Sequence, residues 1–102
     1  MTRLETLSAD RAALQGTLNA TTVVALVDEG KQLIGNAGSS WSLDMAAVEQ
    51  VSSAAVALLL EWLRAAQAAR VEMTVSNVPA SLLPIIQVSD LESVFAGVFV
   101  KS

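Results

Sequence analysis

The side chains of this 102-residue chain that could do chemistry are few, and Ser53 is the most prominent of them. A serine hydroxyl becomes a nucleophile only when a neighbouring base takes its proton. The chain contains no histidine and no cysteine, and it has no Ser-x-x-Lys spacing. The sequence therefore gives Ser53 no partner for nucleophilic catalysis, and we expect no catalytic residue and no enzyme activity.

Asp44 and Glu49 are the only other pair that suggests chemistry, as two carboxylates for acid-base work. Nothing else in the sequence marks a polar cleft around them. We interpret Asp44 as a hydrogen-bond acceptor in the loop at the end of a strand, and Glu49 as a solvated charge. Because the usual zinc ligands, histidine and cysteine, are absent, we also expect no metal site and no cofactor.

The composition narrows the classes of partner. The chain has 6 basic and 10 acidic residues and a net charge of -4, with no basic cluster, which excludes a nucleic-acid surface. Hydrophobic residues make up 53% and charged residues 16%, a surplus of apolar groups over an ordinary soluble domain that favours a surface for a partner. The length predicts one domain, residues 1–102.

The apolar stretch 54–69 resembles a membrane span but is too short, since a span needs about 20 largely apolar residues. Glu61, Arg64 and Gln67 also interrupt it. The N-terminus lacks the apolar core of a signal peptide. From the sequence we expect a cytoplasmic protein.

Hydrophobic periodicity predicts strands that alternate with helices. The expected strands are 3–7 and 11–18 around a turn at Ala9-Asp10, then 39–45, 71–76 and a closing strand or tail at 98–100. The first expected helix begins at Asn19 or Thr21 and ends at Gly35, and the second spans 53–70. The third starts near Ser81, with Pro84 in its first turn and Ile85 and Ile86 packed inward, and one more helical turn follows at 91–95. This order predicts an α/β fold with a mixed sheet of four to five strands flanked by helices.

Helix 53–70 is the element that carries the functional hypothesis. One side of it gathers the residues expected in the core: Ala55, Val56, Leu58, Leu59, Trp62, Leu63, Ala66 and Ala69. The opposite side begins with small apolar residues, Ala54, Ala57 and Leu60, and becomes polar from Glu61 and Arg64 onward. We interpret this side as a docking face with a polar rim. The alternative, equally compatible with the pattern, is that the chain's own loops or terminus cover it.

Ser53 is expected at the start of this helix, as its N-cap. A hydroxyl at a helix N-terminus also lies where the helix dipole and free amides stabilise a phosphate or an acidic group. In α/β sheets, sites gather at the carboxyl ends of strands and the helix starts that follow. That place corresponds here to residues 44–53.

Three blocks of the sequence together resemble the STAS domain family, in particular its MlaB-like members. They are residues 14–18 (LQGTL), 43–48 (LDMAAV) and 51–60 (VSSAAVALLL), and the resemblance extends into 71–76 and 82–95. It implies a mixed sheet flanked by helices. It also implies that Ser53 matches the Ser or Thr that anti-sigma factor antagonists have at the start of the helix after the third strand.

The resemblance implies two possible roles. MlaB-like proteins bind the ATPase subunit (MlaF-like) of a phospholipid-transporting ABC complex on the cytoplasmic side of the inner membrane, so the chain would be an accessory subunit that touches the membrane only through its complex. The transporter maintains outer-membrane lipid asymmetry. In the alternative, the chain is an anti-sigma factor antagonist whose partner kinase phosphorylates Ser53. The expected partner-binding residues are Ser52, Ser53, Ala54, Ala57, Leu60, Glu61 and Arg64.

Two departures from the family pattern favour docking over a phosphorylation switch. Ser52 stands where MlaB-like sequences usually have an acid, and Ala54 and Ala55 replace glycines. Alanine restricts both close backbone approach and positive φ angles, and these are what a kinase would need near Ser53.

Overall fold

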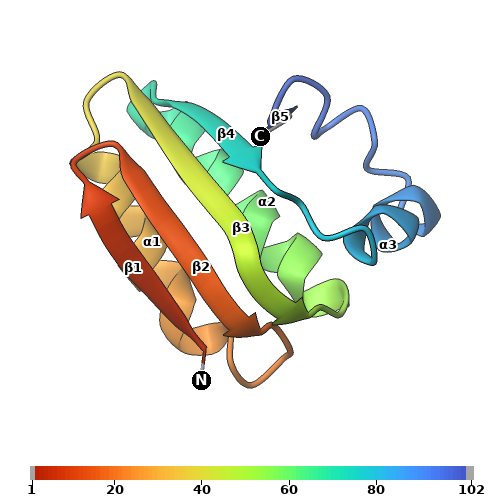
Figure 1. Cartoon of the computed structure of the whole chain (residues 1–102). Helices are drawn as coiled ribbons and strands as arrows, with labels where there is room; N and C mark the ends of the chain where they lie inside the picture. Colours follow the sequence, from red (N-terminus) through yellow and green to blue (C-terminus); the bar gives the residue numbers. More distant parts are fainter. Residues whose placement is uncertain (1, 101–102) are drawn as a thin grey trace.

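The computed structural model describes residues 2–100, which form a five-stranded mixed sheet and three helices (Figure 1). In chain order the elements are β1 (Arg3–Ser8), β2 (Arg11–Thr17), α1 (Val24–Gly35), β3 (Ser40–Gln50), α2 (Ser53–Ala69), β4 (Glu72–Ser76), α3 (Leu82–Val88) and β5 (Phe99–Val100). The strands lie in the order β1-β2-β3-β4-β5. Among the strands of residues 2–100, only β1 and β2 pair antiparallel, so the expected mixed α/β sheet in one compact domain is confirmed.

The sheet has one covered face. Helices α1 and α2 lie side by side against it, and α3 lies next to α2 on the β4 and β5 side of the molecule (Figure 1). Alternate residues of the strands point toward α1 and α2 and are buried, among them Leu14 in β2, Leu43 in β3 and Val75 in β4. Within residues 2–100, no helix covers the other face (Figure 1).

Trp62 of α2 is the central contact of the core. Its ring meets Trp41 of β3 edge to face, with ring centroids 5.6 Å apart and planes at 87°. Its indole Nε1 donates a hydrogen bond to the Val27 carbonyl of α1 at 3.1 Å. Gly30 of α1 lies directly against the same ring, so that a Cβ there would overlap the indole. One side chain thus joins the sheet to both helices.

Helix α1 begins later than expected, at Val24 instead of Asn19 or Thr21. The Asn19 Oδ1 accepts hydrogen bonds from the Thr21 and Thr22 amides, at 2.9 and 3.0 Å. The Thr22 hydroxyl donates to the Thr17 carbonyl at 2.8 Å. These side-chain hydrogen bonds hold residues 19–23 in a turn, because Asn and Thr compete with the helix for backbone groups.

Strand β3 is longer than expected, and it places Asp44 inside a strand. Pairing of β3 with β4 stops at Asp44 opposite Ser76, but pairing with β2 continues to Gln50. Two register shifts in the β2 pairing interrupt the alternation of buried and exposed residues, and Gly16 has a φ of 94° between them. The prediction that a strand ends near Met45 and leaves Asp44 in a loop was therefore wrong.

The later elements follow the sequence closely. Helix α2 ends at Ala69, and Arg70 caps it with a left-handed conformation. Val71, Met73 and Val75 are buried together, as expected. Pro84 falls in the first turn of α3 and Ile86 is buried, but Ile85 is only half-buried. None of the helices formed by the described residues combines the length and apolar character needed to cross a membrane.

We expect the substitution Gly30→Ala to destabilise the fold by about 1 to 3 kcal/mol, the usual cost of overpacking a core. The added methyl group would push Trp62 away from Val27 and Trp41. Gly35→Ala is the matched control, since a Cβ there meets nothing within 4 Å. Urea unfolding of both variants measures the effect, and equal stability of the two would contradict the role given to Trp62.

Candidate functional site

The cap of helix α2 is Ser52, which corrects the assignment of Ser53. Ser52 is extended, with φ -137° and ψ -175°, and its Oγ accepts a hydrogen bond from the Ala54 amide at 3.2 Å. The same hydroxyl donates to the Leu18 carbonyl at 3.2 Å. Ser52 therefore fixes the start of α2 to the end of β2.

Ser53 is consequently the first residue of the helix, with its side chain exposed. No hydrogen bond found among residues 2–100 uses its hydroxyl. Its neighbours in the adjoining surface are Pro84, Ile85, Val88 and Ser89, and none of these side chains is a base. The geometry leaves Ser53 accessible at a helix start without activating it.

The outer side of α2 is open to solvent near its beginning. Ser53, Ala57 and Arg64 are exposed, whereas Ala54, Leu60 and Glu61 are half-buried. The expected core side is buried from Ala55 to Ala66, but Ala69 is exposed because it lies in the last turn. Among residues 2–100, no loop covers this face at Ser53 and Ala57. Leu60 also packs against the core.

Helix α3 forms the second wall of this surface, a contact that the sequence alone did not predict. A groove of about 320 Å³ lies between the start of α2 and α3, lined by Ser53, Pro84, Ile85, Val88 and Ser89. Val88 is 89% exposed. The i, i+3 spacing of Ile85 and Val88 indicates in the sequence that they share one side of a short helix. Only the fold brings that side next to Ser53.

The polar rim of the face is a small ion-pair network. The Glu61 carboxylate lies 3.2 Å from Arg64 Nη1 and 3.5 Å from Lys31 Nζ of α1. Between 42% and 67% of each of these side chains is exposed, so their mutual attraction is screened by water and contributes little to stability. They remain available to exchange partners with charges on another protein.

Asp44 lies apart from this face and has a structural role. Its Oδ1 accepts hydrogen bonds from Asn77 Nδ2 at 2.8 Å and from the Ala46 amide at 2.9 Å. The Asn77 hydrogen bond, then the Ala46 hydrogen bond, and less strongly the charge of Arg11 lower the pKa of Asp44, against the opposing effect of burial. Asp44 therefore joins β3 to the residue that follows β4. Glu49, its suggested partner, is exposed.

Among residues 2–100, no group of three or more His, Cys, Asp or Glu side chains is placed to hold a metal ion.

The substitution Asp44→Asn should lower the free energy of unfolding at pH 7, because the hydrogen bonds favour the charged carboxylate. Since the pKa of Asp44 is lower in the folded than in the unfolded state, its stabilisation is present above the unfolded value of about 4. It is lost as the pH falls through the folded value. Urea unfolding should show the difference from the wild type narrowing below pH 4, with Glu49→Gln as a control of little effect at any pH. A pH-independent difference would contradict this account.

The fold is similar to that of solved anti-sigma factor antagonists. The unphosphorylated form of SpoIIAA matches with a TM-score of 0.75 and 16% identity, covering 100% of this chain and 88% of that one. The phosphorylated form of this Bacillus cell fate determinant gives 0.72 and 16%, covering 100% and 91%. An anti-sigma-factor antagonist (STAS) domain protein from Planctomyces limnophilus gives 0.70 and 16%, covering 99% and 87%. At these identities the likeness concerns the fold alone.

The match at the level of sequence is more specific than the likeness of fold. No curated protein matches it significantly. A family model described as "Mlab, STAS domain" matches residues 1–100, which include the strands, the three helices and the start of α2 with its two serines. The chain therefore belongs to the STAS domain family, through the model that describes the MlaB type.

Proposed function

We propose that this protein is a non-catalytic accessory subunit that binds the ATPase of an Mla-type phospholipid ABC transporter. It would act on the cytoplasmic side of the inner membrane, in a complex that maintains outer-membrane lipid asymmetry. The observation that carries the proposal is the exposed small-residue face at the start of α2, in a chain matched by the MlaB-type family model.

The chemistry of the face supports protein contact. Ser53 and Ala57 are small and exposed, so that another backbone approaches the helix closely. Ile85 and Val88 add apolar contact area in the adjoining groove, and Glu61 with Arg64 supplies charges at the border. An apolar centre with a polar rim is the usual anatomy of a protein interface.

Docking of this kind gives an accessory subunit a physical means of support. A subunit that binds only the folded ATPase stabilises it by mass action, by about 2.7 kcal/mol when its free concentration is 100 times the Kd. No chemistry by the accessory subunit is needed.

The substitution Ala57→Arg should weaken binding to the ATPase at least about tenfold, equivalent to about 1.4 kcal/mol, because a long charged side chain would hold the partner away. Copurification and titration calorimetry with the ATPase measure the effect. Ala68→Arg is the matched control: it is an exposed alanine on the same side of α2, about three turns further along the helix.

Circular dichroism should show both variants folded. An intact complex with Ala57→Arg would refute the proposed face. Ala57 is a better test than Leu60, since Leu60 also packs against the core.

The alternative function, an antagonist of an anti-sigma factor controlled by phosphorylation, has its own support in Ser53. The Ser53 hydroxyl is exposed at the first position of α2, where the helix dipole stabilises a phosphate. The proteins of similar fold include SpoIIAA, solved in unphosphorylated and phosphorylated forms.

If the alternative holds, incubation with the cognate anti-sigma factor kinase and ATP should add one phosphate. Ser53→Ala should abolish the mass shift. Ser52→Ala should retain it, because the Ser52 hydroxyl is engaged in the helix cap. Intact-protein mass spectrometry measures the phosphate, and an unmodified wild-type protein would argue against this function.

A further inference from the structure

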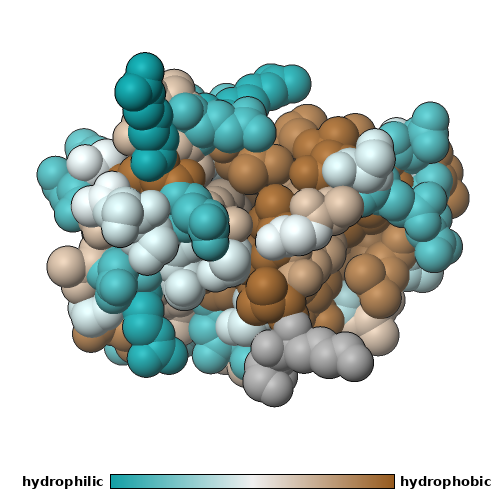
Figure 2. All heavy atoms as spheres, turned by 90° about the horizontal axis from the view of Figure 1, so that it is seen from above, coloured by the Kyte–Doolittle hydropathy of each residue, from teal (hydrophilic) through white to brown (hydrophobic). Residues whose placement is uncertain are grey.

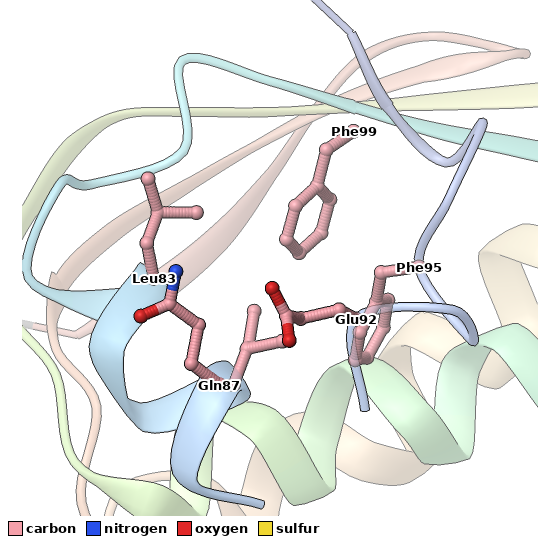
Figure 3. A pocket seen from close by; sticks show the side chains of 6 residues that line it. Leu83, Gln87, Glu92, Phe95 and Phe99 are labelled. Atoms are coloured by element: carbon pink, nitrogen blue, oxygen red, sulfur yellow. The ribbon is translucent and has the colours of Figure 1, made fainter. Parts of the chain in front are cut away.

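A second hollow lies on another side of α3, between that helix and the C-terminal segment (Figure 3). We call it the aromatic pocket. Its volume is about 190 Å³, and it is lined by Leu83, Ile86, Gln87, Glu92, Phe95 and Phe99. None of these residues lines the groove at Ser53, so α3 separates two distinct hollows.

The pocket is built from one face of a helix and a pair of aromatic rings. Leu83, Ile86 and Gln87 have the i, i+3, i+4 spacing that places residues on one side of a helix. Phe95 and Phe99 stack, with centroids 4.9 Å apart and planes at 13°. Phe95 is buried and Phe99 half-buried. The rings therefore give the pocket a preformed aromatic wall.

Two polar side chains, Gln87 and Glu92, also line the pocket. Figure 3 shows the Glu92 carboxylate close to the Phe99 ring, and the Gln87 amide beside Leu83 on the other side of the hollow. Glu92 takes part in none of the ion pairs found among residues 2–100. The pocket thus combines an aromatic surface with a carboxylate, which is a charged hydrogen-bond acceptor, and has an amide on its opposite wall.

This combination selects a planar cation. A guanidinium group is attracted to an aromatic face and donates paired hydrogen bonds to a carboxylate. An ammonium group is more strongly hydrated and lacks the flat surface that stacks. Small-molecule sites usually measure about 300 to 1,000 Å³, so a pocket of about 190 Å³ suits a single side chain better than a whole metabolite.

The surroundings favour a protein as the source of that cation. Viewed from above, hydrophobic surface gathers on the half of the molecule that carries β4, β5 and α3, while the hairpin half is more hydrophilic (Figure 2). Leu83 and Val94 are exposed apolar residues on or after α3. The net charge of -4 also attracts a basic partner.

We propose that the aromatic pocket receives an arginine side chain of the protein that docks on α2 and α3, an inference that rests on the proposed function for the partner's identity. Helix α3 lines both hollows, so one partner surface spans them. The groove at Ser53 takes its apolar contacts, and the pocket takes its arginine. The arginine would stack against Phe99 and pair with Glu92.

The first test needs no partner. Isotope-labelled protein is titrated with N-acetyl-arginine methylamide and, separately, with N-acetyl-lysine methylamide, and amide shifts are followed by NMR. The arginine compound should give saturable shifts at millimolar concentration confined to residues 83–99, and Glu92→Gln should weaken its binding at least about fivefold. Glu29→Gln, an exposed carboxylate change on α1, should have no effect. Absence of saturable shifts, or equal binding of the lysine compound, would overturn the proposal.

The second test uses the complex with the transporter ATPase. Glu92→Gln and Phe99→Leu should each weaken the complex about tenfold, and the Glu92→Gln effect should shrink at high salt because it removes a charge interaction. If Ala57→Arg disrupts the complex while both pocket variants bind normally, the pocket inference fails and the proposed function stands. If Ala57→Arg also binds normally, the proposed function fails with it.

Discussion

The packing of Trp62 against Gly30 and Trp41 is the constraint on which the rest of the structure depends. The Trp62 ring of α2 packs against Gly30, where α1 has no side chain, and its indole nitrogen donates a hydrogen bond to the Val27 carbonyl at 3.1 Å. The ring edge then rests on Trp41 of the central strand β3. Interiors pack as densely as organic crystals, so this contact fixes the rotation of α2 about its axis.

That rotation decides which residues of α2 are left for a partner. With Trp62 turned inward, Ala55, Leu59 and Ala66 are buried with it, and Ser53 and Ala57 remain at the surface. The Ser52 hydroxyl then ties the first turn of α2 to the Leu18 carbonyl at the end of β2. The exposed start of the helix is therefore held rigidly, which reduces the entropy that a docking partner would have to overcome.

Helix α3 extends this surface in two directions. It is a short helix with few buried residues, Leu82 and Ile86, so most of its surface faces outward. One part lies beside Ser53 and another beside the stacked rings of Phe95 and Phe99. The two hollows differ in chemistry, since the first is lined largely by apolar groups and the second carries a carboxylate and an amide. A partner that fills both would be recognised by its shape and by its charge.

Periodicity within single elements was enough to predict the mixed α/β fold and most of the core side of α2, but it left open whether the chain's own loops cover Ser53 and Ala57. The choice of Ser52 as the cap depends on a contact between distant parts of the chain, since its hydroxyl also bonds to the Leu18 carbonyl. The same holds for Asp44, which lies inside β3 because register shifts against β2 let that strand continue to Gln50. Local patterns also could not place α3 beside Ser53, since that contact joins residues about 30 positions apart in the chain, and chain folding, rather than periodicity, brings such residues together.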